Sequence, residues 1–172
     1  AGMLDNETGY IRLTRFSKNS GPEMRSAILN LQHDNASRII IDLRDNPGGL
    51  LQSAIEILDM LIPKGELLLS TKGRMPEANK RYFARKTPII EDDVKIAILI
   101  NEGSASASEI ISGTIQDLDR GVIVGTTSFG KGLVQSVYGL DSSGKRSLKV
   151  TTAKYYVPSG RLIQKPGYIN DK

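Results

Sequence analysis

The chain has 172 residues, of which 39% are apolar and 24% charged, and this balance excludes a low-complexity disordered chain and predicts one compact domain. There is no cysteine and a single histidine, His33, which excludes disulfides, thiolate zinc sites and two-histidine mechanisms. The net charge of +4 is spread along the chain, and there are only six Tyr and three Phe, so no nucleic-acid surface is expected. We expect no metal and no cofactor.

No stretch approaches the ~20 apolar residues of a membrane helix, and no signal-peptide pattern opens the chain. The chain begins Ala-Gly and ends at Lys172 without a signal that would close a helix or strand. Residues 1–172 are therefore expected to form one domain of a longer protein, without stable membrane insertion. The oligomeric state stays open.

Apolar periodicity predicts alternating strands and helices along most of the chain. In chain order, the expected elements are a strand at 10–16, a helix from 20 to about 33–35, a strand at 39–41, a helix at 50–61, a strand at 67–69, a hairpin strand near 82–83, a strand at 96–100, a helix at 107–118, a strand at 122–124, and β structure at 133–138 and 148–157 around a turn at 142–144. The runs 39–41 and 96–100 are unbroken apolar segments, which is typical of strands covered on both faces. This order predicts an α/β fold with parallel strands and right-handed crossovers, and a β-rich C-terminal part.

In parallel sheets, chemistry gathers just past the carboxyl ends of the strands. Three expected turns follow strands in this way: 44–49, 101–108 and 125–132. These turns are also where Gly and Ser concentrate. They are therefore the first places to look for a functional site.

The segment 101–109 reads Asn-Glu-Gly-Ser-Ala-Ser-Ala-Ser-Glu and opens the expected third helix. A serine there lies near backbone N–H groups that have no partner inside the helix, and these groups favour an anion. It could therefore act as a nucleophile, because these N–H groups would stabilise the oxyanion that forms when the serine attacks a carbonyl carbon. The alternative is structural, because Ser106 and Glu109 fit the S-x-x-E capping box, which is the commoner use of such a pattern.

The segment 125–132, Gly-Thr-Thr-Ser-Phe-Gly-Lys-Gly, nearly matches the phosphate-binding loop G-x-x-x-x-G-K-[ST]. Gly132 stands where the magnesium-binding hydroxyl is needed, and the next residues predict a strand instead of the required helix. A nucleotide-binding function for this segment is the second hypothesis. Lys131 itself could be a general base, since a lysine among apolar groups loses its proton more readily, or simply a surface residue on a glycine turn.

The third segment, 42–49, reads Asp-Leu-Arg-Asp-Asn-Pro-Gly-Gly. Its glycines allow close approach of a ligand to the backbone, or they form an ordinary tight turn. Asp42 and Arg44 could simply pair with each other. His33 lies in a polar setting at a helix end and is expected at the surface, so a serine nucleophile would need another base, for which Lys131 is the candidate.

Together, these segments resemble the C-terminal processing peptidases, or tail-specific proteases. The motifs 42–49, 103–109 and 129–135 (Phe-Gly-Lys-Gly-Leu-Val-Gln) occur in the order found in that family. The resemblance implies that Ser106 is the nucleophile, Lys131 the general base and Gln135 a residue that holds the lysine. It also implies an oxyanion hole formed by the backbone N–H groups of Gly49 and Ala107. The implied fold is a crotonase-like βαβ superhelix.

The resemblance implies a serine endopeptidase that cleaves near the C-termini of protein substrates through an acyl-enzyme. Such peptidases usually carry a PDZ domain, which this chain does not contain, and they work outside the cytoplasm, in the periplasm or cell envelope. Lys131 and Gln135 are four residues apart, so a shared strand would place them on one face. A catalytically silent peptide-binding module with the same fold is the third hypothesis.

Overall fold

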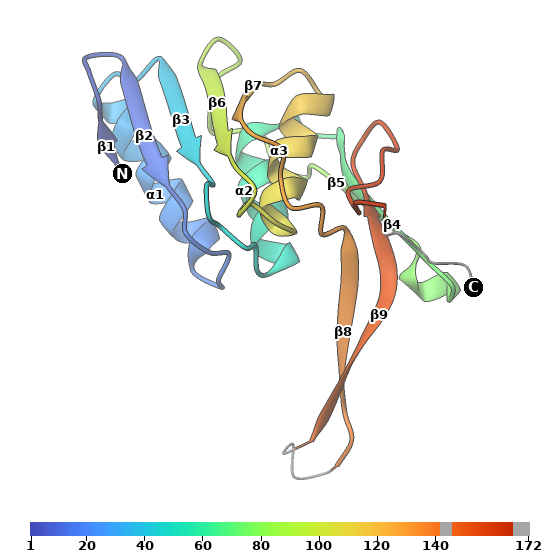
Figure 1. The fold of residues 1–172 in the computed structure, drawn as a ribbon. Helices are drawn as coiled ribbons and strands as arrows, with labels where there is room; N and C mark the ends of the chain where they lie inside the picture. The colour runs from blue at the N-terminus through green and yellow to red at the C-terminus, as the bar shows by residue number, and fades with distance from the viewer. Residues whose placement is uncertain (142–145, 167–172) are drawn as a thin grey trace.

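The computed structural model describes residues 1–141 and 146–166. Its elements, in chain order, are β1 (Gly2–Met3), β2 (Thr8–Arg12), α1 (Ser20–His33), β3 (Arg38–Asp42), α2 (Leu51–Leu61), β4 (Leu67–Gly73), the 3-10 helix η1 (Pro76–Ala78), β5 (Lys80–Phe83), β6 (Lys95–Ile100), α3 (Ala107–Asp117), β7 (Val122–Gly125), β8 (Leu133–Gly139) and β9 (Ser147–Tyr156). Figure 1 shows α1, α2 and α3 packed against one sheet, and the long hairpin of β8 and β9 that projects away from them.

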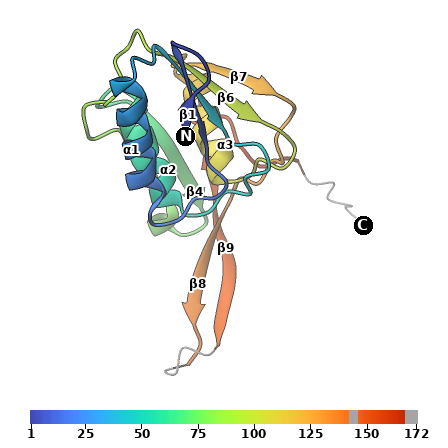
Figure 2. The same cartoon turned by 90° about the vertical axis from the view of Figure 1, so that its left-hand side faces the viewer.

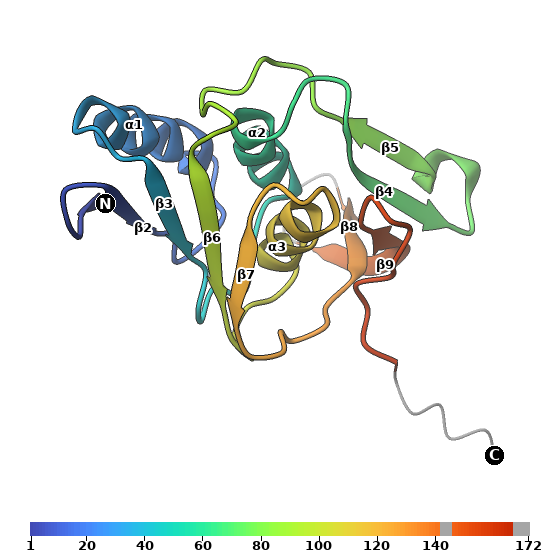
Figure 3. The same ribbon diagram turned by 90° about the horizontal axis from the view of Figure 1, so that it is seen from above.

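The first sheet has the order β1-β2-β3-β6-β7, in which β2, β3, β6 and β7 are parallel and β1 is antiparallel. Each parallel strand is added on the same side of the one before it, so the strand order never reverses. Because right-handed crossovers in a constant direction place every helix on the same face, α1, α2 and α3 form a single layer. Figure 3 shows this layer beside the row of strands.

The core lies between this helical layer and one face of the sheet. Ile39, Ile41 and Ile98 point from the strands into the core, and α1 packs on α2, which packs on α3. Ile40 and Leu99, which alternate with these residues, are only partly buried. The expectation that 39–41 and 96–100 are covered on both faces is therefore wrong, because a sheet without a strand-order reversal receives helices on one face only.

The second sheet is antiparallel, with the order β5-β4-β9-β8. Its last two strands extend as the projecting hairpin, which Figure 2 shows from the side. This sheet is the β-rich part expected from the sequence. The turn predicted at 142–144 lies outside the described residues.

Most of the predicted elements are confirmed, with shifts of a few residues at their ends. The strand predicted at 10–16 ends at Arg12, although Phe16 forms an isolated bridge to Gly49. The short β1 has no counterpart in the predictions. Among the described residues, no helix is long and apolar enough to cross a membrane.

Candidate active site

The three turns singled out in the sequence meet at the carboxyl ends of β3, β6 and β7. The Ala105 N–H donates to the Asn46 carbonyl at 3.0 Å, which joins the turn after β3 to the turn after β6. The Phe129 N–H donates to the Ser104 carbonyl at 3.0 Å, which joins the turn after β6 to the loop after β7. We call residues 101–109 the serine turn, residues 42–49 the glycine turn and residues 125–132 the lysine loop.

Asn46 organises the glycine turn from inside the protein. It is fully buried, its amide donates to the Leu13 carbonyl at 2.7 Å, and its side-chain oxygen accepts from the Gly48 N–H at 2.9 Å. Its own carbonyl accepts two bonds from the serine turn, one from the Ala105 N–H and one from the Ser108 hydroxyl. Asn46 was not among the predicted site residues; the signal for it in the sequence is its residue type, since Asn readily hydrogen-bonds to the backbone two residues on.

The three serines of the serine turn differ in what their hydroxyls do. Ser104 donates to the Leu43 carbonyl at 2.7 Å and Ser108 to the Asn46 carbonyl at 2.9 Å, and both serines are fully buried. Ser106 is half-buried, and its hydroxyl proton goes to no acceptor within residues 1–141 and 146–166. The flanking serines therefore fasten the turn, and Ser106 is the one whose hydroxyl is available.

Ser106 has a backbone conformation that serine rarely adopts. Its φ of 56° and ψ of −109° make it one of four non-glycine residues with positive φ among those described. Such conformations cost on the order of 1–3 kcal/mol and persist where the surroundings impose them, often at functional sites. Ser106 is also the N-cap of α3 and forms a capping box with Glu109, so both the structural and the chemical interpretations of this serine apply to one residue.

The glycine turn packs directly against Ser106. A Cβ placed on Gly48, whose φ is +93°, would lie 2.8 Å from the Ala107 nitrogen and 2.9 Å from the Ser106 Cβ. The Gly48 N–H is already bonded to Asn46. The N–H groups of Gly49 and Ala107 donate to no acceptor in the part of the chain that the structure describes. Both predicted oxyanion donors are therefore open, and the turns that carry them are in contact.

Glu109 links the serine turn to the lysine loop. It is only 4% exposed, and its carboxylate accepts four hydrogen bonds. The donors are the Ser106 N–H at 2.7 Å, the Lys131 N–H at 2.8 Å, the Gly130 N–H at 2.6 Å and the Ser128 hydroxyl at 2.8 Å. The capping-box pattern indicated only the first of these bonds, because spacing along one helix carries no information about a loop 20 residues further on.

Lys131 is half-buried and, within the described residues, forms no ion pair. It lies two residues before β8 begins, and the β8–β9 register shifts between Val134 and Gln135. Lys131 and Gln135 therefore do not share a strand face in the way predicted, because only Gln135 lies in β8. Gly132 packs against Gln164, and its N–H donates to the Gln164 side-chain oxygen at 3.0 Å. Gln135 is exposed, and its approach to Lys131 stays a prediction.

The lysine loop does not lead into a helix. It follows β7 and enters β8, so it lacks the helix N-terminus that a phosphate-binding loop needs. The nucleotide-binding hypothesis thus loses its structural basis. His33 is at the surface as expected, with 89% of its side chain exposed.

Asp42 and Arg44 pair with each other, as the sequence suggested they could. Arg44 donates from Nε and Nη2 to the two carboxylate oxygens at 2.9 and 2.7 Å, and the Tyr10 hydroxyl donates to Asp42 Oδ2 at 2.6 Å. The hydrogen bonds from Arg44 are the main cause that holds the pKa of Asp42 far below its usual value. This fully buried carboxylate anchors the start of the glycine turn.

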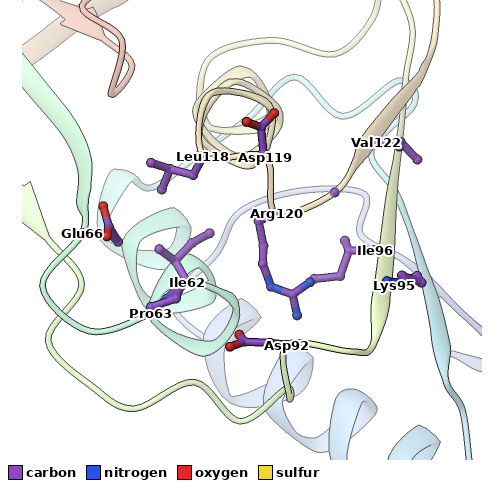
Figure 4. A pocket seen from close by; sticks show the side chains of 11 residues that line it. Ile62, Pro63, Glu66, Asp92, Lys95, Ile96, Leu118, Asp119, Arg120 and Val122 are labelled. Atoms are coloured by element: carbon purple, nitrogen blue, oxygen red, sulfur yellow. The ribbon is translucent and has the colours of Figure 1, made fainter.

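A cavity of about 770 Å³ lies at the opposite ends of β6 and β7, next to Ile96 and Val122 (Figure 4). Arg120 spans it and donates to the carbonyls of Leu61, Val94 and Glu91 at 3.0 Å each. Burial lowers the pKa of Arg120. Arg120 thus has a structural role, since it connects the segments that line the cavity through their carbonyls. The cavity lies away from the three turns.

Residues 7–172 match the model of peptidase family S41. The chain is 42% identical over 172 residues to the carboxy-terminal-processing protease of Bartonella bacilliformis, covering 98% of this chain and 39% of that protein. It is 40% identical over 167 residues to the carboxyl-terminal-processing protease of a Picosynechococcus strain, covering 96% and 39%. Among solved structures, a photosystem II D1 C-terminal processing protease matches with a TM-score of 0.81 and 32% identity, covering 95% and 41%.

The chain thus has a mostly parallel sheet with one layer of helices on one face, and a serine at positive φ at the N-terminus of α3. The chain belongs to peptidase family S41. It spans about two fifths of the length of the relatives named above.

Proposed function

We propose that this chain is the catalytic core of a serine endopeptidase that cleaves protein substrates near their C-termini. Ser106 carries the proposal. It is a positive-φ residue at a helix N-terminus, its hydroxyl proton is uncommitted within the described residues, and the next N–H along the chain is open. The match to family S41 and the names of the processing proteases above support the reaction class.

In the proposed reaction, Ser106 Oγ attacks the scissile carbonyl carbon while its proton passes to the neutral amine of Lys131. The negative charge on the former carbonyl oxygen is stabilised by the N–H groups of Gly49 and Ala107. When the C–N bond breaks, the Lys131 ammonium returns the proton to the leaving amine, and the acyl-enzyme remains on Ser106. Water then attacks the ester carbon, giving a proton to Lys131, and the Lys131 ammonium returns that proton to Ser106 Oγ as the acyl C–O bond breaks and the carboxylic acid product leaves.

The remaining parts of the proposal rest on the resemblance. Gln135 is proposed to hold the Lys131 amine, and the fold is proposed to be crotonase-like, in keeping with the constant direction of its βαβ crossovers. The substrate is an extended C-terminal protein tail. The site of action is proposed to be outside the cytoplasm, in the periplasm or cell envelope. A silent peptide-binding module is the alternative that the following experiment separates from an enzyme.

Labelling with a fluorophosphonate probe tests the nucleophile, because the probe reacts covalently only with an activated serine. We expect the wild-type chain to be labelled on Ser106 and the Ser106→Ala variant to be unlabelled. Peptide hydrolysis should fall by several orders of magnitude in that variant, as is usual when a nucleophile is removed. Ser108→Ala is the matched control, because it removes a hydroxyl from the same turn. Equal labelling of wild type and Ser106→Ala would refute the assignment.

A further inference from the structure

Glu109 is a buried carboxylate without a cation partner. No Lys, Arg or His forms an ion pair with it among the described residues, although burying a charge is costly unless the charge is paired or well hydrogen-bonded. Three backbone N–H groups and one hydroxyl provide those hydrogen bonds instead. Its place in the first turn of α3 adds the favourable field of the helix N-terminus. The carboxylate and the groups that donate to it thus fix one another's positions.

These bonds exceed what a helix cap requires. A capping-box glutamate needs only the N–H of the N-cap residue, here Ser106, and such a glutamate can remain in water. Glu109 also accepts hydrogen bonds from Ser128, Gly130 and Lys131, which belong to the lysine loop after β7. Oε2 accepts both the Ser106 N–H and the Lys131 N–H, so one atom lies between the backbones of the two residues.

We propose that Glu109 is a positioning residue for the Ser106–Lys131 pair, an inference that rests on the function proposed above. One carboxylate oxygen fixes the nucleophile's backbone against that of the base, and the other holds the loop before the base through Gly130 and Ser128. The hydrogen bond from the Ser106 N–H also holds Ser106 at its φ of 56°. Glu109 itself touches neither the substrate nor the proton that moves.

The Glu109→Gln variant separates this role from that of an ordinary cap. The glutamine oxygen can take the place of Oε2 and accept from the Ser106 and Lys131 N–H groups, but its NH₂ group then faces the Gly130 N–H and cannot accept from it. The loop before the base is then displaced while the helix cap is kept. A misplacement of about 1 Å in such a site lowers the rate by on the order of 100-fold. We therefore expect kcat to fall by that factor with KM nearly unchanged, because Glu109 does not contact the substrate.

Asp117→Asn is the matched control. Asp117 is a second largely buried carboxylate of α3, and it accepts bonds from the Ser159 N–H, the Ser159 hydroxyl and Arg161 without contacting the serine turn or the lysine loop. Its loss should lower stability but change kcat by no more than about twofold. Glu109→Asp retains the charge on a shorter side chain, so it should recover part of the kcat that Glu109→Gln loses.

The experiment measures kcat and KM for a C-terminal-tail peptide, the rate of fluorophosphonate labelling, and Tm for wild type and the three variants. The expected result is a lower kcat and slower labelling in Glu109→Gln, with a Tm drop no larger than that of Asp117→Asn and partial recovery in Glu109→Asp. Wild-type kcat and labelling rate in Glu109→Gln, or equal kcat losses in Glu109→Gln and Asp117→Asn, would overturn the proposal. Failure of the proposed function is a separate result: the wild-type chain itself would not be labelled on Ser106.

Discussion

The serine turn and the lysine loop are similar in composition but are held in different ways. Both are rich in Gly and Ser, and both leave the same edge of the parallel sheet, after β6 and β7. The serine turn is fastened by buried side chains, Ser104 and Ser108, to the glycine turn. The lysine loop is fastened mainly through its own backbone, to Glu109 and to residues 164–165.

This difference shows how a proposed nucleophile and base can be placed with different precision. The serine turn is part of the core, so its strained conformation is imposed by packing that the whole fold supports. The lysine loop enters the exposed hairpin and takes its position from groups that other elements present to it. Changes that break the contacts of the serine turn should therefore lower stability and activity together. Changes that break the contacts of the lysine loop should lower mainly activity.

The largest effect on stability is expected from Gly48→Ala. The added Cβ would lie 2.6 Å from the Ala105 carbonyl oxygen at a residue whose φ is +93°, so it would both strain the backbone and push the glycine turn off the serine turn. We expect a loss of about 4 kcal/mol in unfolding free energy, together with loss of activity. Gly65→Ala is the control, because Gly65 has a similar φ of +98° with open space around it and should cost only about 1 kcal/mol. Urea unfolding of both variants measures the difference, and equal losses would contradict the packing argument.

Ser104→Ala should cost about 2 kcal/mol, because it leaves the Asn101 N–H without its partner and removes one of the two hydrogen bonds to the Leu43 carbonyl, which keeps the bond from the Asn46 N–H. Ser108→Ala removes only the bond to the Asn46 carbonyl and should cost about 1–2 kcal/mol. Below their Tm, both variants should still be labelled by fluorophosphonate on Ser106, at a rate that falls together with their stability. Complete loss of labelling in either folded variant would mean that the wrong serine has been chosen.

Arg44→Gln should destabilise the protein by about 2 kcal/mol at neutral pH, since it removes the half-exposed partner of the buried Asp42. Arg44 holds the pKa of Asp42 below its ordinary value, so the stability that the pair contributes is present above that ordinary value, near 4, and is lost as the pH falls through the lowered pKa. The difference between wild type and Arg44→Gln should therefore shrink between about pH 5 and about pH 2. Unfolding curves across this range test it, and a constant difference would exclude Asp42 as the cause.

The smallest effect concerns Tyr155, which lies beside the lysine loop and whose N–H bonds to the Gly132 carbonyl. Burial raises the pKa of Tyr155 from 10.0 to about 12. The tyrosine of the unfolded chain loses its proton at a lower pH than the buried tyrosine of the folded chain. The raised pKa therefore contributes stability that is fully present below pH 10 and is lost as the pH rises toward 12. We expect wild type to lose roughly 1–2 kcal/mol relative to Tyr155→Phe over this range, measured by alkaline unfolding. Parallel pH dependence in the two proteins would rule out this residue.

Sequence patterns predicted the helices and the parallel strands well, because apolar periodicity is a local property that packing then uses. They failed to predict how many faces of each strand are covered, because this depends on how the helices are layered on the sheet. An unbroken run such as Ile39-Ile40-Ile41 has the same composition whether one or two faces are covered, and only the strand order decides between them. The strand predicted at 10–16 ends at Arg12, and Phe16 then pairs separately with Gly49 in the glycine turn, a contact that the local sequence does not indicate.

At the site, Ser106, Gly49 and Ala107 were singled out from motifs, and the structure brings their turns together. The roles of Asn46 and Glu109 were not predictable from spacing, since their bonds join segments about 20 to 60 residues apart along the chain. The strand-face argument for Lys131 and Gln135 failed because a register shift between Val134 and Gln135 cannot be seen in the sequence.

The central claim is that Lys131 acts as a base and not merely as a positive charge. The most direct test compares peptide hydrolysis and fluorophosphonate labelling in wild type, Lys131→Ala and Lys131→Arg. An arginine keeps the charge but cannot give up its proton, so Lys131→Arg should be as inactive as Lys131→Ala in both assays. Lys131→Arg with the hydrolysis and labelling rates of wild type would contradict the Ser106–Lys131 mechanism.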